Sequence, residues 1–350
     1  SVKVSKFKTQ IRSTKKAEDE DVSQNEIFEF TTQASKSLCH SPKQSMRVAV
    51  AETPNFAEQK PDTWVTIAGD YGGKSNNGSD DSKVIQEAID DGAETIYFPP
   101  GGRWTINRDI YIRNRVRRIL GIEGQIDGKG KFIVEKGAFN ELTIERFSEF
   151  GSGIIQKSTR TILLKNMMVK SLETDEVGTG DIYMEDVSIG SIQLNYQKLW
   201  GRQVTMLGDT KGPKITNNGG TVWILGLTAK DGNTVLQNFN KASAELIGVE
   251  IIASDKAKER PMFINDNSGL SITGLRETLT RGNPFLKVVE ESRVSSKIKS
   301  LFEKDLTQLD EGGAILPLFV GYAPKQGPNE KPIAKFPTRC CWYNPTVFTS

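Results

Sequence analysis

Histidine and cysteine are scarce in this sequence, and their scarcity excludes several classes of site. His40 is the single histidine among 350 residues, so a mechanism or a zinc site that needs two histidines is excluded. Three cysteines are too few for a dense disulfide framework. Cys39 lies about 300 positions before the adjacent Cys340 and Cys341. A bridge from Cys39 to one of this pair, in an oxidising compartment, and buried free thiols are both consistent with that spacing.

Long apolar runs and a bias in charge are also missing. No apolar stretch approaches the roughly 20 residues that cross a bilayer, and residues 1–10 lack the apolar centre of a signal peptide. Lysine and arginine total 46 against 44 acidic residues, which gives a net charge of +2. This balance gives no indication of a surface for nucleic acid or membranes. We therefore expect neither nucleic acid nor a membrane span.

Short β-type runs recur instead, separated by glycine, asparagine or aspartate. From residue 161 six of them can be aligned: TILLKNMMV, DIYMEDVSI, KLWGRQVTM, TVWILGLTA, AELIGVEII and LSITGLRET. Each has one small or polar residue between two apolar stretches, at Asn166, Asp186, Gln203, Gly226, Gly248 and Gly274. A repeat near twenty residues is too short for a strand plus a crossover helix, and it predicts a solenoid. The fold we expect is all-β, a parallel β-helix formed by a single chain.

One amphipathic helix precedes these repeats, and we expect it over residues 80–91. Val84, Ile85, Ala88 and Ile89 form an apolar stripe at helical spacing, and Gly92 supplies the stop. Because the end of a solenoid exposes strand edges and core, we interpret this helix as the N-terminal cap. A helix of an ordinary α/β unit is the alternative.

The chain divides into three parts on this interpretation. Residues 1–60 form an arm and linker, with short strands at EIFEF (26–30) and MRVAVAETP (46–54), and could dock on or belong to a preceding domain. Residues 61–290 form the β-helix. Residues 291–350 begin with an amphipathic helix over 291–309, continue with a strand at AILPLFVGY, and end in an aromatic tail that packs on the solenoid or on a partner.

Alternation within the aligned runs predicts which side chains leave the solenoid. Positions two and four before the separating residue are apolar or small and should face the core. Positions three and one before it should face outward on one side. Since successive turns stack about 4.8 Å apart, Tyr183, Trp200 and Trp223 should form an aromatic ladder that continues to Glu245. Lys165, Glu185 and Arg202 should form a charged ladder beside it.

The two ladders suggest a groove for a polysaccharide. Sugar rings stack on aromatic side chains, so we assign substrate binding to Tyr183, Trp200, Trp223 and Glu245. An acid can protonate a leaving oxygen, and a cation can neutralise a uronate or take its proton, so Glu185, Arg202 and Lys165 are the candidate catalytic residues. The alternative is structural, because such ladders also pack beneath loops or a partner domain. Open aromatics would support an enzyme, and burial under residues 1–60 or the tail would support a structural role.

Other candidates have simpler explanations. Glu123 and Asp127 lie among glycines, which suits turns, and a Ca²⁺ site there is the alternative, although no motif indicates it. We expect no metal site and no cofactor. Asn233 and Asn238 suit asparagines stacked inside the turns. His40 follows Cys39, but adjacent side chains on an extended segment diverge, which argues against a catalytic pair.

The segment DYGGKSNNGSDDSKVIQEAIDDGAETIYFPPGGRWTI resembles the N-terminal signature of the pectate-lyase-superfamily β-helix proteins. That signature is a D-[FY]-G-A turn, a polar loop with D-D, an A-I-Q-x-A-I helix and a V-Y-F-P-x-G-x-Y-x-I strand. Fourteen positions fit: Asp70, Tyr71, Gly72, Asp80, Asp81, Ile85, Gln86, Ala88, Ile89, Tyr97, Phe98, Pro99, Gly101 and Ile106. Gly73 replaces the usual alanine, and Trp104 stands where tyrosine is common. The match covers about forty residues.

The resemblance implies a right-handed β-helix and a secreted, extracellular or periplasmic protein that acts on carbohydrate. The segment before Trp64 also looks like the connector between the halves of tandem β-helix exo-β-1,3-glucanases, which implies a preceding β-helix domain or an assembly. The polygalacturonase motifs N-T-D, D-D, G-H-G and R-I-K and the epimerase motif D-P-H are absent. We therefore expect a polysaccharide hydrolase or lyase without a complete family motif, or a non-catalytic module that binds glycan or forms part of a larger assembly.

Overall fold

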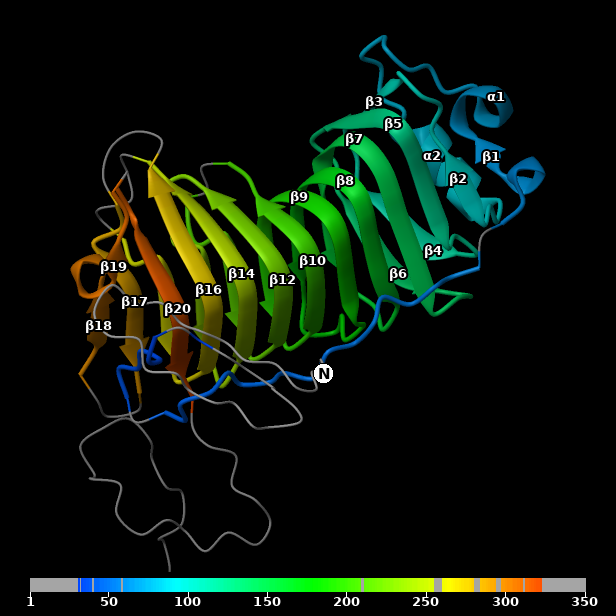
Figure 1. Ribbon diagram of the computed structural model, residues 1–350. Helices are drawn as coiled ribbons and strands as arrows, with labels where there is room; N and C mark the ends of the chain where they lie inside the picture. Colours follow the sequence, from blue (N-terminus) through cyan, green and yellow to red (C-terminus); the bar gives the residue numbers. More distant parts are fainter. Residues whose placement is uncertain are drawn as a thin grey trace, which may run out of the picture.

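The computed structural model describes residues 31, 33–39, 41–57, 59–208, 211–254, 260–279, 284–293, 297–310 and 312–322. These residues form a β-solenoid of about 8 turns with little helix (Figure 1). Within them, 20 strands belong to one hydrogen-bonded network, and successive turns pair in parallel. The predicted parallel solenoid is confirmed.

The elements are short at both ends and long in the middle of the chain. The helices are η1 (Pro61–Thr63), α1 (Ile67–Tyr71), α2 (Ser82–Asp90) and η3 (Glu303–Asp305). The strands are β1 (Val65–Thr66), β2 (Thr95–Tyr97), β3 (Arg103–Ile106), β4 (Ile110–Asn114), β5 (Arg118–Gly128), β6 (Phe132–Gly137), β7 (Glu141–Gln156), β8 (Thr161–Thr174), β9 (Ile182–Asn195), β10 (Lys198–Met206), β11 (Ile215–Asn218), β12 (Thr221–Lys230), β13 (Leu236–Phe239), β14 (Ser243–Ala253), β15 (Phe263–Asp266), β16 (Gly269–Leu279), β17 (Lys287–Ser292), β18 (Lys299–Phe302), β19 (Thr307–Gln308) and β20 (Ala314–Gly321).

The separating residues of the repeat are the corners of the solenoid. Each long strand bends at one left-handed residue, with φ between 49° and 77° at Asn166, Asp186, Gln203, Gly226, Gly248 and Gly274. Glycine adopts this conformation without a steric penalty, and asparagine and aspartate tolerate it better than other residues. The corners stack because the strands on either side pair without a shift in register. The spacing of these residues in the sequence therefore predicts the turns correctly.

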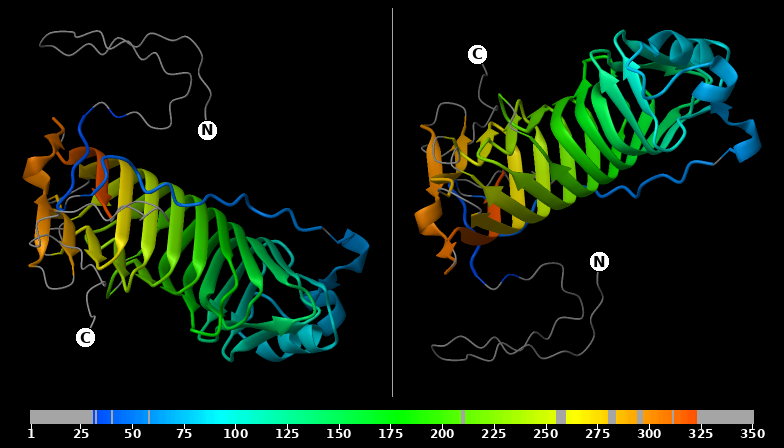
Figure 2. Two further views of the ribbon diagram at one scale, coloured as in Figure 1. Left: turned by 90° about the horizontal axis from the view of Figure 1, so that it is seen from below. Right: turned by 90° about the horizontal axis from the view of Figure 1, so that it is seen from above.

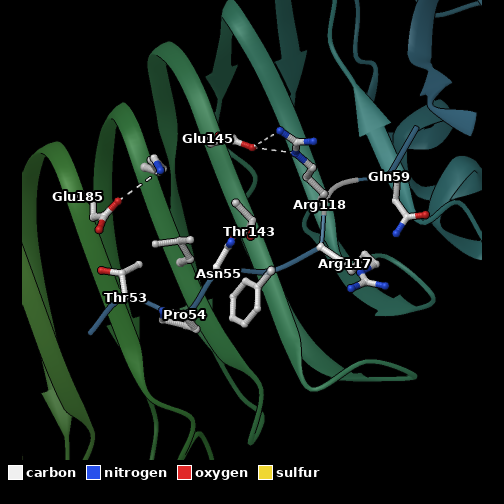
Figure 3. Close-up of a pocket in the computed structure, with 13 residues that line it drawn as sticks. Thr53, Pro54, Asn55, Gln59, Arg117, Arg118, Thr143, Glu145 and Glu185 are labelled. Atoms are coloured by element: carbon white, nitrogen blue, oxygen red, sulfur yellow. Dashed lines mark hydrogen bonds and ion pairs between the residues drawn. The ribbon is translucent and has the colours of Figure 1, made fainter. Parts of the chain in front are cut away.

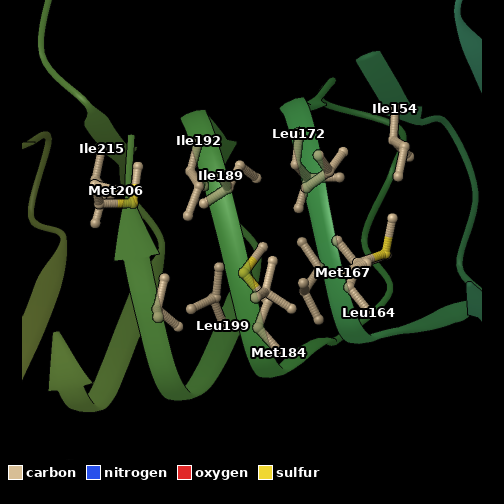
Figure 4. Close-up of a cluster of buried hydrophobic side chains, with 14 of the residues drawn as sticks. Ile154, Leu164, Met167, Leu172, Met184, Ile189, Ile192, Leu199, Met206 and Ile215 are labelled. Carbon is tan, nitrogen blue, oxygen red and sulfur yellow. The ribbon is translucent and has the colours of Figure 1, made fainter. Parts of the chain in front are cut away.

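The interior is a continuous apolar stack. Leu164, Met184, Gly201, Ile224, Leu246 and Ile272 occupy one column, as the alignment predicts. Figure 4 shows the middle of this core, where isoleucine, leucine and methionine side chains from β7 to β11 meet. The five side chains of this column are fully buried, and burying each one stabilises the fold by about 1.5–3 kcal/mol.

Asparagines line one inner corner. Asn217, Asn238 and Asn265 are fully buried on β11, β13 and β15. Asn217 donates to the Oδ1 of Asn238 at 2.7 Å, and Asn238 donates to the carbonyl of Gly269 at 2.7 Å. The inward stacking predicted for Asn238 is confirmed, whereas Asn233 accepts a hydrogen bond from Arg260 at 2.9 Å.

Replacing Asn238 with alanine should lower the free energy of unfolding by about 1–3 kcal/mol, because the change leaves buried partners unsatisfied. Asn218→Ala is the control, since Asn218 is only half-buried and its amide bonds Asn195 on the outside of the same corner. Urea unfolding followed by circular dichroism would measure both. Equal decreases in the free energy of unfolding in the two variants would show that the fully buried Asn238 contributes no more to stability than the half-buried Asn218.

At the N-terminal end of the solenoid the predicted helix is present, and a second, shorter helix was not predicted. The expected helix is α2, which buries Ile85, Ala88 and Ile89 and lies with α1 at one end of the solenoid (Figure 1). Asp81 occupies the N-cap position of α2, and Asp80 accepts a hydrogen bond from the backbone N–H of Ser82 at 3.0 Å. Helix α1 was not predicted, because its five residues are too few for a periodic pattern.

The helix predicted over residues 291–309 is wrong. Its described residues form the end of β17, then β18, η3 and β19. Strand β18 pairs antiparallel with β17, and β20 pairs antiparallel with β16. The last turn of the solenoid has unpaired strand edges, and hydrogen bonding to these edges outweighs the helical propensity of residues 291–309. Ile298, one of the apolar residues of the helical pattern, is 63% exposed. The strand predicted at AILPLFVGY is confirmed as β20.

Residues 41–57, called the arm below, run along the outside of the solenoid from the end near β20 to the end near α1 (Figure 2). Before the arm, Lys36 pairs with Phe319 of β20, and Cys39 is disulfide-bonded. The free thiol is therefore excluded for Cys39, whose partner lies outside the described residues.

The strand expected over residues 46–54 is wrong, because the arm is extended but joins no ladder. The strand expected at 26–30, His40 and the C-terminal tail also lie outside the described residues.

Candidate functional site

The outward columns have the register that the sequence predicts. Tyr183 pairs with Trp200, Trp200 with Trp223 and Trp223 with Glu245, on β9, β10, β12 and β14. The rings of Tyr183 and Trp200 are stacked, with centroids 5.1 Å apart and an interplanar angle of 16°. The aromatic ladder therefore exists on the outer face of the solenoid, as expected.

The ladder is not open to solvent. Tyr183 is 7% exposed, and Trp200 and Trp223 are each 6% exposed. Together with Leu163 they form a second apolar cluster, separate from the core, against which Val48, Ala51 and Phe56 of the arm pack. The groove expected for a polysaccharide is filled by the chain's own N-terminal segment.

The arm is bound by hydrogen bonds as well as by apolar contact. The carboxylate of Glu245 accepts the backbone N–H groups of Arg47 at 3.1 Å and Val48 at 2.7 Å. The indole N–H of Trp200 donates to the carbonyl of Ala49 at 3.0 Å. Of the four residues assigned to substrate binding, Trp200 and Glu245 are thus hydrogen-bonded to the arm, and Tyr183 and Trp223 belong to the cluster against which the arm packs.

The candidate catalytic residues are also paired. Arg202 donates to the carbonyl of Ala51 at 2.9 Å and to the Oγ1 of Thr53 at 3.2 Å, and its guanidinium lies 5.3 Å from the ring centroid of Trp223. Lys165 forms an ion pair with Glu185 at 3.4 Å. The structure therefore brings Lys165, Glu185 and Arg202 together, as their adjacent registers predict.

Glu185 is held in its charged form. A hydrogen bond from the hydroxyl of Thr53 lowers the pKa of Glu185, and Lys165 and Arg202 lower it further against the opposing effect of burial. A general acid needs the opposite shift, because it must keep its proton near neutral pH. Glu185 as placed can accept hydrogen bonds but is a poor proton donor.

A pocket lies where the arm passes over the earlier turns. It has a volume of about 250 Å³ and is lined by arm residues 53–57, by Gln59, by Arg117 and by side chains of β5, β7, β8 and β9 (Figure 3). Thr143 and Leu163 occupy here the column that holds large aromatics further along. Because these side chains are smaller than tyrosine or tryptophan, a space remains beneath the arm.

Glu145 is the residue of this pocket that sequence reasoning missed. Glu145 lies beside Lys165 in the strand register, so it extends the charged ladder by one turn. The guanidinium of Arg118 donates to Glu145 from Nε at 2.7 Å and from Nη2 at 2.6 Å (Figure 3). The signal was present, because ELTIERF has the same alternation and Arg146 is another left-handed corner, with φ 61°. Extending the alignment one turn earlier would have found it.

Neither a metal nor a membrane span is indicated by the residues that the structure describes. No group of three or more histidine, cysteine, aspartate or glutamate side chains among them could hold a metal ion. Glu123 has a left-handed backbone, and Asp127 lies 3.5 Å from Arg103, which suits turn and ion-pair roles. Within the same ranges no helix has the length and apolar character needed to cross a membrane.

Comparison with known proteins adds one distant structural likeness. No family model and no curated protein matches the sequence. Among solved structures the chain is similar to tailspike protein 3 of bacteriophage CBA120, at 10% identity and a TM-score of 0.21. The match covers 66% of this chain and 61% of the tailspike chain.

Proposed function

We propose that this chain is a non-catalytic β-solenoid module with a structural role in a larger assembly. The observation that supports this role is the arm, which covers the outward ladder and engages its polar groups. A groove that served a polysaccharide would need its aromatic faces exposed. Here those faces pack against Val48, Ala51 and Phe56.

The state of the charged groups supports the same proposal. Glu145 is bound by Arg118 through two nitrogens, and Glu185 is paired with Lys165. The lowered pKa of Glu185 keeps this carboxylate ionised, so it does not serve as the proton donor that hydrolysis requires. Lys165 and Glu185 thus form an ion pair across two adjacent turns, and Glu145 is bound by Arg118 of the preceding turn.

A polysaccharide hydrolase or lyase, extracellular or periplasmic, is the second candidate, and the pocket favours it. Glu145, Lys165 and Glu185 follow one another on successive turns and all line this pocket. Two turn spacings put the backbones of the two glutamates roughly 9–10 Å apart, near the upper limit for an inverting pair of carboxylates, about 6.5–9.5 Å. A glycan-binding role without catalysis would use the same pocket.

A polysaccharide screen separates these functions. The full chain should release no product from a panel of neutral and acidic polysaccharides, and reducing-end and unsaturated-uronate assays would detect hydrolysis and elimination respectively. Glu185→Gln and Glu145→Gln are the test variants, and Glu149→Gln is the control, because Glu149 is half exposed on β7 outside the pocket. Product from wild type that disappears in a test variant but not in the control would overturn the structural proposal.

We also infer that the solenoid is right-handed and that α2 covers its N-terminal end. The family-like signature around α2 supports the handedness. Burial of Ile85, Ala88 and Ile89 in the same apolar cluster as Ile110 and Ile112 supports the covering role.

A further inference from the structure

The ladder groove is the surface formed by Tyr183, Trp200, Trp223 and Glu245, on which the arm lies. Side chains of the solenoid bind the arm there mainly at the main-chain atoms of the arm. The hydroxyl of Ser271 accepts the N–H of Met46 at 3.2 Å, and Glu245 accepts the next two N–H groups. Trp200 and Arg202 then donate to the carbonyls of Ala49 and Ala51. Five main-chain groups within six residues are therefore bound by side chains of the solenoid, which is a mode of peptide recognition.

The contact at Glu245 has a specific backbone geometry. Arg47 is left-handed, with φ 53°, and this turns its N–H and that of Val48 toward one carboxylate. Successive N–H groups arranged in this way form an anion-binding concavity. Glu245 is 3% exposed and is also bound by the hydroxyl of Ser271 at 3.3 Å, so the acceptor is held in position for a polypeptide ligand.

Side chains of the arm divide between the groove and solvent. Val48, Ala51 and Phe56 pack on the ladder, whereas Val50 is 53% exposed and the side chain of Glu52 is 91% exposed. The groove thus selects an extended segment with an apolar residue at the position of Val48, a small one at Ala51 and an aromatic one at Phe56. Charged or large residues are tolerated at the positions between them.

We propose that the ladder groove is a polypeptide-binding site that takes the arm of a second copy of this chain in place of its own. The contacts of residues 46–56 with the ladder would be reproduced by the same segment in trans, and the closed form is favoured by the tethering of the arm, which raises its effective concentration. The tether includes the chain just before the arm, where Lys36 pairs with Phe319 and Cys39 is disulfide-bonded. Residues 60–63, which join the arm to the solenoid, are exposed and can open without disturbing the core. The inference rests on the structural role proposed above, because arm exchange would link the copies of an assembly.

Two complementary variants test the exchange. Val48→Asp damages the arm and leaves the groove intact, whereas Glu245→Ala damages the groove and leaves the arm intact. Each alone should remain monomeric. Mixed at equal concentration they should form a one-to-one complex, detected by sedimentation velocity, because one chain supplies the free groove and the other the free arm. The absence of a complex in the mixture would overturn the exchange.

A peptide-binding measurement tests the same proposal if the Val48→Asp variant does not fold. A fluorescent peptide with the sequence of residues 44–57 should bind Ala51→Leu, whose own arm fits poorly, at least about tenfold more tightly than wild type, where the tethered arm competes. The same peptide carrying Asp at the position of Val48 is the control. Equal binding of the two peptides, or none, would overturn the proposal. The polysaccharide screen tests the structural role separately, so failure of exchange leaves that result standing.

Discussion

Replacing Trp200 with alanine is expected to lower the free energy of unfolding by about 3 kcal/mol and to release the arm. Trp200 is 6% exposed, stacks on Tyr183 and donates to the carbonyl of Ala49. Truncating a buried tryptophan typically costs about 3–5 kcal/mol, and we expect the lower value because the arm can settle toward the space. Urea unfolding would give the stability, and the rate of tryptic cleavage after Lys43 and Arg47 would report the arm.

Trp200→Phe is the matched control for that change. It retains an aromatic ring next to Tyr183 and Trp223 but removes the indole donor, so it should cost only about 1 kcal/mol. An alanine variant whose arm is cleaved no faster than that of wild type would show that the arm does not depend on the ladder.

Replacing Glu277 with glutamine is expected to stabilise the chain above pH 7. Glu277 is 1% exposed on β16. Its Oε1 accepts the N–H of Phe285 at 2.8 Å, while its Oε2 is buried without a hydrogen-bond partner in the described part of the chain. Burial raises the pKa of Glu277 to about 7, and the charge of Glu303 adds to that effect against the hydrogen bond from Phe285.

The sign of the pH dependence follows from that pKa. Because the folded chain binds the Glu277 proton more tightly than the unfolded chain, whose value is near 4.5, the protonated group stabilises the fold below about pH 4.5. That stability is lost as the pH rises through about 7, and the full loss is at most about 3 kcal/mol. Glutamine stays neutral, so the variant should match wild type near pH 4 and exceed it near pH 8.

Thermal unfolding of the two proteins across this pH range would test the prediction. Glu290→Gln is the control, because Glu290 is partly exposed on β17 and pairs with Lys287 at 2.9 Å. A stability difference between wild type and Glu277→Gln that does not change with pH would show that Glu277 titrates normally in the fold.

The sequence predicted the solenoid well because its corners and its core follow local rules. Asn166, Asp186 and Gly226 mark corners since few residue types adopt the left-handed conformation. Alternation between the corners then decides which side chains enter the core. These two features are sufficient to place Tyr183, Trp200 and Trp223 in one outward column.

The same reasoning failed where the outcome depended on distant segments. Residues 299–302 have a helical pattern, but the open edge of β17 provides hydrogen bonds that the isolated segment lacks. The arm was expected as a strand, yet it is bound by side chains from β10, β14 and β16, more than 140 residues away. No periodic pattern in residues 41–57 could indicate those partners.

By itself, the sequence determined the solenoid, its register and the identity of the outward residues, because each depends on backbone conformation and burial within a single turn. Only the tertiary structure decided that the aromatic ladder is covered and that Glu185 and Arg202 are engaged by the arm. The physical reason is that an outward face becomes buried only if a distant segment packs on it with a gain that exceeds the conformational entropy lost when that segment is ordered. Here the gain from Val48, Ala51 and Phe56 on the ladder, with five main-chain hydrogen bonds, favours the chain's own arm.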